Sequence, residues 1–141
     1  MKSDYVASAV IRSDPEVVWR ILTDATGYAA WNPEIISIEG NLAAGARIMA
    51  RVKLGDGTIR TVPMRVTTFT PTTRMVWTGG LPLGLFVGIR DFTVTPHSNG
   101  TEFRMHLTMR GLLAPLILKS VGDRQPEIDR FAAALKAHVE R

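Results

Sequence analysis

The sequence contains no cysteine, and this absence excludes disulfide bonds, thiol nucleophiles and metal sites built from thiolates. No run of about 18 consecutive apolar residues occurs either, so we expect no membrane insertion. Residues 1–5 also lack the apolar run of a signal peptide. From these absences we expect a cytoplasmic protein.

Groups of polar residues that carry catalysis or bind metals are also scarce. The three histidines, His97, His106 and His138, are dispersed. None shares an obvious face with a carboxylate, which argues against a metal site and against general acid–base catalysis. The serines show no nucleophile-elbow spacing, and no phosphate-binding glycine motif is present. The sequence therefore predicts no metal and no cofactor, and it leaves open whether the protein is an enzyme.

The basic residues lack clustering. The net charge of +4 raises nucleic acid and anionic membranes as partners. However, the 17 lysines and arginines are scattered singly, without a polybasic tail or a basic motif interleaved with aromatic residues. We therefore expect no nucleic acid partner, and the pattern does not decide between a monomer and a homodimer.

The sequence does contain enough apolar material for one core. Its 141 residues are 45% hydrophobic and 21% charged, which is typical of a globular protein. This length is sufficient for one ordinary domain and too short for two. We therefore predict a single domain over residues 1–141.

Hydrophobic periodicity predicts a strand at residues 5–12 and two short helices after it. Ser13 or Asp14 is the expected N-cap of the first helix, with Glu16 completing a capping box. A further helical turn is expected at residues 28–31, before Asn32-Pro33 forces extended chain. The buried face of the first helix is predicted from Val17, Val18, Ile21 and Leu22.

Beyond residue 34 the apolar period changes to two, which predicts a series of strands. The turn Gly55-Asp56-Gly57 favours a hairpin, because Asp-Gly readily supplies a positive φ. Residues 79–84 form a glycine-rich stretch without charge, which we interpret as a mobile loop that serves as a lid. The predicted strands are residues 35–39, 46–54, 58–70, 74–79, 85–96 and 101–110.

Residues 112–141 carry the longest helical pattern in the chain. Beyond Pro126 the apolar residues recur at spacings of three and four, which predicts an amphipathic helix that covers the sheet. Gly122 and Pro126 divide the pattern into two pieces. The first piece, residues 112–121, is apolar on nearly every side, so we predict that it borders a cavity mouth or a partner surface.

The order and spacing of several motifs resemble the START-like superfamily, also called SRPBCC, and in particular its polyketide cyclase/dehydrase and lipid-transport branch. The resemblance covers nearly the whole chain. It is carried by Ile11-x-x-x-Pro15-Glu16-x-Val18-Trp19-x-x-Leu22-x-Asp24, Tyr28-x-x-Trp31-Asn32-Pro33, Ile38-Glu39-Gly40, Val76-Trp77, Phe92-Thr93-Val94 and Gly111-Leu112-Leu113-Ala114-Pro115.

This resemblance implies an α+β helix-grip fold. In that fold a seven-stranded curved antiparallel sheet wraps around a long C-terminal helix, with two short helices after the first strand and an apolar cavity between sheet and helix. The order of elements predicted from periodicity agrees with it. The resemblance does not transfer a reaction, because members include cyclases, lipid carriers, hormone receptors and chaperone cofactors.

The apolar faces of the predicted strands and helix supply the candidate ligand-binding residues. The alternative is that the same side chains pack together as a solid core. The methionines on these faces favour a cavity, because their side chains adapt to irregular space. The candidates are Trp31, Asn32, Met64, Val66, Met75, Trp77, Phe86, Arg90, Phe92, Phe103, Met105, Leu107, Leu116, Phe131 and Leu135.

Arg90 is the most informative of these residues. It is in phase with Phe86 and Phe92, so it is predicted to point inward, where an arginine needs an acid, a carbonyl or a ligand oxygen. A strand irregularity after Gly88, or a structural ion pair with Asp24 or Glu34, is the alternative. Trp31 either closes the pocket rim or anchors the core, and Asn32 either binds ligand or caps a turn.

Three functions are compatible with the pattern. The first is the binding of a small hydrophobic molecule, such as a lipid, a polyketide or an aromatic metabolite, by a carrier or sensor. The second is a polyketide cyclase, aromatase or dehydratase in which Arg90 polarises a carbonyl. The third is an interaction module like the chaperone cofactors of the superfamily, which works through an exposed apolar patch.

Overall fold

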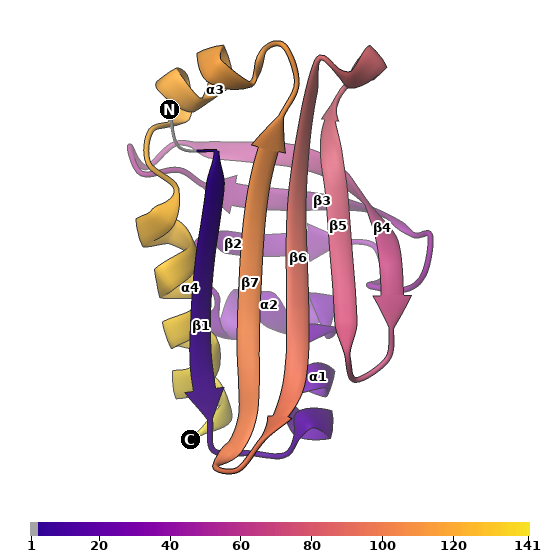
Figure 1. Cartoon of the computed structure of the whole chain (residues 1–141), viewed down its shortest axis with the longest axis vertical. Helices are drawn as coiled ribbons and strands as arrows, with labels where there is room; N and C mark the ends of the chain where they lie inside the picture. The colour runs from indigo at the N-terminus through magenta and orange to yellow at the C-terminus, as the bar shows by residue number, and fades with distance from the viewer. Residues whose placement is uncertain (1–2) are drawn as a thin grey trace.

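A computed structural model describes residues 3–141. Within them, seven strands form one antiparallel sheet with the spatial order β1-β7-β6-β5-β4-β3-β2 (Figure 1). The β2–β7 run is a simple meander, and β1 joins it by pairing with β7. The strands are β1 (Asp4–Ile11), β2 (Ile35–Glu39), β3 (Arg47–Lys53), β4 (Ile59–Thr70), β5 (Arg74–Leu81), β6 (Phe86–His97) and β7 (Gly100–Arg110).

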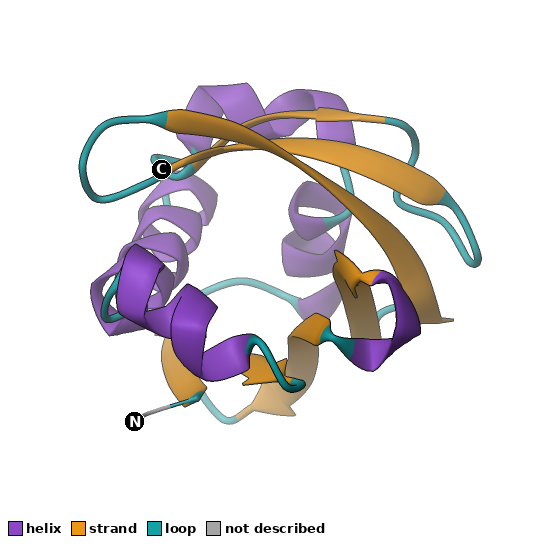
Figure 2. Cartoon of the chain, turned by 90° about the horizontal axis from the view of Figure 1, so that it is seen from above, coloured by secondary structure: helices purple, strands orange, loops and turns teal. Residues whose placement is uncertain are grey.

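The helices lie between β1 and β2 and at the C-terminus. Seen along the long axis of the molecule, the sheet curves around the helices (Figure 2). The predicted α+β helix-grip architecture is therefore confirmed. The helical elements are α1 (Pro15–Leu22), the 3-10 turn η1 (Ala25–Gly27), α2 (Tyr28–Trp31), the 3-10 turn η2 (Pro82–Gly84), α3 (Ala114–Val121) and α4 (Gln125–Val139).

The strand boundaries follow the predicted ones within one residue, with one exception. β5 continues through Leu81 because Gly79 and Gly80 pair with Gly88 and Val87 of β6. The predicted loop at residues 79–84 is therefore wrong in its first half. Ladder pairing uses backbone groups, which a glycine supplies as well as any other residue.

The start of α1 also differs in detail from the prediction. Asp14 is the N-cap and Pro15 follows it, but no side chain caps the helix, so the predicted capping box does not form. The backbone of Ser13 bonds to β7 instead, because its carbonyl accepts a hydrogen bond from Thr101 Oγ1 at 2.7 Å. This bond ties the entry of α1 to the start of β7.

Phe131 of α4 is the centre of the core. Its ring centroid lies 5.3 Å from that of Trp31, 5.5 Å from Phe92 and 5.9 Å from Phe103. Phe92, Phe103 and Phe131 are almost fully buried. Aromatic pairs at such separations add to the stabilisation from apolar burial, so α4 packs tightly on this half of the sheet.

The C-terminal helical segment consists of two helices, as Gly122 and Pro126 predict. α3 ends at Val121, Gly122 has a φ of 77°, and α4 begins at Gln125. A positive φ favours glycine and ends a helix. α3 lies across the end of the sheet while α4 runs along β1 (Figure 1). Within residues 3–141, no helix has both the length and the apolar character needed to cross a membrane.

Polar side chains of α4 and its end cap the free edge of β1. Lys136 Nζ donates to the Val10 carbonyl at 2.6 Å, and Gln125 Nε2 donates to the Val6 carbonyl at 2.8 Å. Glu140 accepts from Lys136 Nζ at 2.7 Å and from the Arg12 backbone N–H at 2.9 Å. These bonds satisfy edge carbonyls that otherwise invite another strand.

The contacts of Glu140 predict a pH dependence of stability. The hydrogen bonds from Lys136 and from the Arg12 N–H lower the pKa of Glu140 from 4.5 to about 2. The stabilisation is therefore present above pH 4.5 and is lost as the pH falls toward 2. Urea unfolding at several pH values measures it. We expect wild type to exceed Glu140→Gln in unfolding free energy at neutral pH and the difference to shrink as the pH falls from 4.5 toward 2, whereas a constant difference would contradict the assignment.

Candidate functional site

A pocket of about 190 Å³ lies at the end of the sheet that α3 covers. Its walls come from the ends of five strands and from α3, whereas α4 contributes only the residue that precedes it, Arg124. The lining residues are Val52, Leu54, Arg60, Val62, Met64, Gly79, Gly80, Phe86, Gly88, Arg90, Leu107, Met109, Ile117, Val121 and Arg124.

The pocket exists because glycines, which have no side chain to fill the space, occupy positions of the sheet at this end. Gly88 occupies an inward position of β6 between Phe86 and Arg90. A methyl group at Gly88 would make only ordinary van der Waals contacts, at 3.7 Å from a ring carbon of Phe86 and 3.8 Å from the Gly79 carbonyl oxygen, so this position has room for a side chain. Gly79 is different, because a methyl group there would come within 2.7 Å of the Pro63 carbonyl oxygen. Gly79 therefore permits the close approach of neighbouring strands, whereas Gly88 leaves space that forms part of the pocket.

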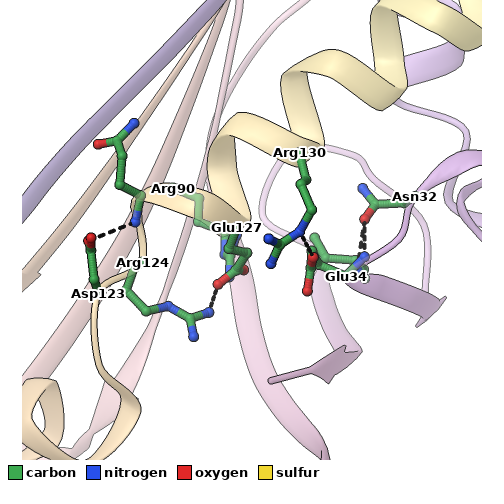
Figure 3. Close-up of polar contacts among 9 residues, drawn as sticks. Asn32, Glu34, Arg90, Asp123, Arg124, Glu127 and Arg130 are labelled. Carbon is green, nitrogen blue, oxygen red and sulfur yellow. Dashed lines mark hydrogen bonds and ion pairs between the residues drawn. The ribbon is translucent and has the colours of Figure 1, made fainter. Parts of the chain in front are cut away.

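Two buried arginines of the pocket lining, Arg90 and Arg124, share one buried carboxylate, that of Glu127. Arg90 of β6 donates through Nη2 to Glu127 Oε1 at 3.0 Å, and Arg124 pairs with the other oxygen, Glu127 Oε2 (Figure 3). Arg90, Arg124 and Glu127 are 8%, 6% and 5% exposed. One carboxylate therefore serves two guanidinium groups, and we call this group the arginine cluster.

The positions of these residues follow from their elements. Glu127 lies in the first turn of α4, where the helix dipole favours a negative charge. Burial lowers the pKa of Arg90 to about 10, and burial together with neighbouring Arg90 lowers the pKa of Arg124 to about 10. Both arginines remain charged at neutral pH, so the cluster has one positive charge in excess.

A second ion pair lies beside the arginine cluster. Arg130 Nε donates to Glu34 Oε1 at 2.5 Å, and Glu34 is 7% exposed (Figure 3). Asn32 fixes the turn before Glu34, because its Oδ1 accepts from the backbone N–H groups of Glu34 and Ile35 at 3.0 and 2.8 Å. The acid that we considered as a partner for Arg90, Glu34, is thus taken by Arg130.

The structure brings only some of the candidate residues to the pocket. Met64, Phe86, Arg90 and Leu107 line it, and strand phase placed Arg90 inward as predicted. The remaining strand and α4 candidates pack in the solid core around Phe131, away from the pocket, as in the alternative interpretation. They are Val66, Met75, Trp77, Phe92, Phe103, Met105, Phe131 and Leu135.

The other three candidates also lie outside the pocket lining. Asn32 caps a turn, and Trp31 is half-buried, packed edge-on against Phe131 and stacked on His138. Leu116 does not line the pocket: its side chain is 66% exposed, and the next residue, Ile117, lines the pocket instead. α3 is apolar on nearly every side, so its periodicity does not identify the buried face.

Sequence reasoning missed Arg124 and Glu127. The signal for Glu127 was present, because it lies four residues before Phe131 and eight before Leu135, on the same stripe of the helix. An acidic residue on an apolar stripe predicts a buried cation nearby. Arg124 stands between two helices, where no periodicity applies, so no local pattern indicates that it is buried.

Exposed leucines lie on the segments that flank the pocket. Leu83 of η2 is 97% exposed and Leu112, just before α3, is 85% exposed. The two segments meet where the Leu113 N–H donates to the Leu85 carbonyl at 2.8 Å. The pocket therefore has an apolar surface beside it.

A second hollow, of about 560 Å³, lies between β1 and α4. It is lined mainly by short side chains such as Ala7, Ala9 and Ala132, and its charged residues, Asp129 and Lys136, are not buried. Lys136 is already bonded to the Val10 carbonyl. The smaller pocket, which combines an apolar lining with buried charge, is therefore the stronger candidate site.

The shared carboxylate of the arginine cluster predicts a large effect of Glu127→Gln. Loss of its charge leaves Arg90 and Arg124 buried without a counter-charge, which costs roughly 3–5 kcal/mol of unfolding free energy. The matched control is Asp91→Asn. Asp91 follows Arg90 on β6, and its ion pair with Arg74 of β5 is exposed to solvent. Loss of this pair costs at most about 1 kcal/mol of unfolding free energy. Urea unfolding compares the two variants, and equal losses would refute the assignment of a buried cluster.

The fold resembles that of several solved structures. In solved structures, the backbone matches a START superfamily protein from Mycobacterium smegmatis with a TM-score of 0.76 at 18% identity, covering 99% of this chain and 98% of that one. A protein from Thermus thermophilus gives a TM-score of 0.74 at 20% identity, with 96% of each chain covered. At such identities these matches establish the fold alone.

Sequence comparison adds the family. No curated protein matches this sequence. The family model described as polyketide cyclase / dehydrase and lipid transport matches residues 3–140, which is almost the whole chain. The protein therefore belongs to the polyketide cyclase/dehydrase and lipid transport family, within a START-like fold.

Proposed function

We propose that this protein binds a small apolar molecule in the pocket under α3 and acts as a carrier or sensor for it. The observation that supports this proposal is the pocket itself, about 190 Å³ in volume and lined by apolar side chains and glycines above buried charge. The family description, which names cyclisation and lipid transport, supports an apolar ligand.

The volume restricts the size of the ligand. Most ligand pockets measure roughly 300–1,000 Å³, so this one is small. A cavity of about 150 Å³ accepts benzene, and a pocket of 190 Å³ therefore accommodates one ring with a short chain, or one end of a longer molecule. The rest of a longer molecule would extend past Leu83 and Leu112, whose exposed side chains offer apolar contact.

The polar groups at the pocket favour binding over catalysis. Arginine holds and orients oxygen atoms, but it remains protonated and therefore does not serve as a general base. Arg90 retains the ability to polarise a carbonyl, which is the role that an enzyme would need. Because Glu127 already holds its guanidinium group, we favour a fixed recognition element in a binding protein.

The hinge between α3 and α4 suggests how a ligand enters. α3 contributes Ile117 and Val121 to the pocket wall, and it is joined to α4 through Gly122, whose φ is 77°. A methyl group at Gly122 would meet no atom within 4 Å, so the linker has space around it. We infer that rotation at Gly122 moves α3 and widens the entrance.

Filling the pocket tests the proposal. Gly88→Leu adds a side chain at a residue that lines the pocket, and its Cβ would make only ordinary contacts of 3.7–3.8 Å. The substitution should therefore weaken the binding of a neutral probe, phenylpropanol, at least about tenfold. An amide NMR titration measures the dissociation constant, and the melting temperature of the variant shows that it is folded.

The control is Gly55→Leu, the same substitution in the β3–β4 turn, where a side chain also meets nothing within 4 Å. It should bind phenylpropanol as wild type does. Undiminished binding by Gly88→Leu, or no binding by the wild type, would contradict the proposed pocket.

A further inference from the structure

The side chains that line the pocket fall into two chemical classes. Twelve of the fifteen lining residues are apolar or glycine, and the other three are Arg60, Arg90 and Arg124. Every polar side chain of this lining is therefore a cation. Apolar walls select an apolar body, and cations select an oxygen-bearing or anionic group.

The arginine cluster is not neutral in itself. Glu127 supplies one carboxylate to Arg90 and Arg124, and each of its oxygens is already paired with one of them. One positive charge therefore remains in a site that is largely removed from water. Burial of an uncompensated charge is costly, and an anion beside the two guanidinium groups would compensate it.

The charged groups around the cluster leave the excess in place. The neighbouring acid, Glu34, is paired with Arg130, so the enlarged group holds three arginines and two glutamates. Tyr28, which is also buried near Arg90, donates its hydroxyl hydrogen to the Leu22 carbonyl at 2.5 Å. These neighbours add no net negative charge at the arginine cluster.

Two buried donors of the cluster also have no partner. Among the residues that the structure describes, Arg90 Nη1 and Arg124 Nε make no hydrogen bond although each atom is buried. Buried nitrogen donors are nearly always hydrogen-bonded in proteins. The two donors belong to different residues that line the same pocket, so one ligand group with two acceptor oxygens can reach toward both.

We propose that the pocket recognises a small apolar acid, with a carboxylate received by Arg90 and Arg124 and an apolar ring or chain packed against Phe86, Met109 and Ile117. This inference rests on the proposed function and adds the chemical class of the ligand. A carboxylate matches the planar guanidinium group in charge and geometry. A neutral alcohol leaves the excess charge uncompensated, and an amine adds repulsion.

Three probes with the same apolar body test the inference on the unmodified protein. Phenylpropionate, phenylpropanol and phenylpropylamine differ only in carrying a negative charge, no charge or a positive charge at neutral pH. We expect the acid to bind about tenfold or more tightly than the alcohol, as is typical of hydrogen bonds to charged groups, and the amine to bind most weakly. Amide NMR titrations at constant ionic strength give the three dissociation constants.

A pair of variants locates the charge that matters. Arg124→Met keeps an apolar side chain of similar length and leaves Arg90 and Glu127 as a balanced pair, so the preference for the acid over the alcohol should fall to near one. The control Arg104→Met removes an exposed charge from β7, and it should keep the full preference for the acid.

Each outcome separates the two proposals. If phenylpropanol binds as tightly as phenylpropionate, the inference is overturned while the proposed function stands. If none of the three probes binds, the proposed function itself is overturned. Equal loss of acid preference in Arg104→Met and Arg124→Met would show that overall charge, rather than the arginine cluster, attracts the acid, and this also overturns the inference. The comparison of the three probes uses only the wild-type protein, so it tests the inference even if a variant fails to fold.

Discussion

The arginine cluster is the interaction on which the arrangement of the C-terminal half depends. Arg90 points inward from β6, and a buried guanidinium group needs an acid or another oxygen acceptor. Glu127 meets it from the first turn of α4. The pairing therefore fixes where α4 begins against the sheet, and with it the point at which the chain must turn from α3. Arg124, the residue before α4, is drawn into the same cluster.

The cluster also separates two regions of different packing. Along β6, Phe92 lies on one side of Arg90 in a dense aromatic core, and Gly88 lies on the other side in the pocket. α4 fills the first region with Phe131, whereas α3 covers the second without filling it. The fold thus combines a rigid half, where a large side chain meets each inward position, with a half in which a glycine leaves space.

The two halves have different parts in the structure. The likeness to proteins at 18–20% identity shows that the sheet and helices form with few shared side chains. The aromatic core around Phe131 belongs to one half, and the residues that line the pocket belong to the half at the α3 end. In this protein those residues are short or apolar, apart from three arginines. Ligand chemistry is therefore a property of this lining rather than of the fold.

The sequence by itself determined the order of elements, the hairpins and the division at Gly122, because period, turn residues and helix breakers act over a few positions. It also predicted that Arg90 faces inward, since alternation along one strand is a local property, but it left open an irregularity after Gly88 that would turn Arg90 outward. Only the tertiary structure decided that Glu127, 37 residues away, is the partner of Arg90, and that Arg124 is buried with them. The same holds for the solid packing around Phe131 and for the pocket before Gly88. Both depend on sheet curvature and on how α3 and α4 are placed over it, which arise from contacts between distant segments and leave no local pattern.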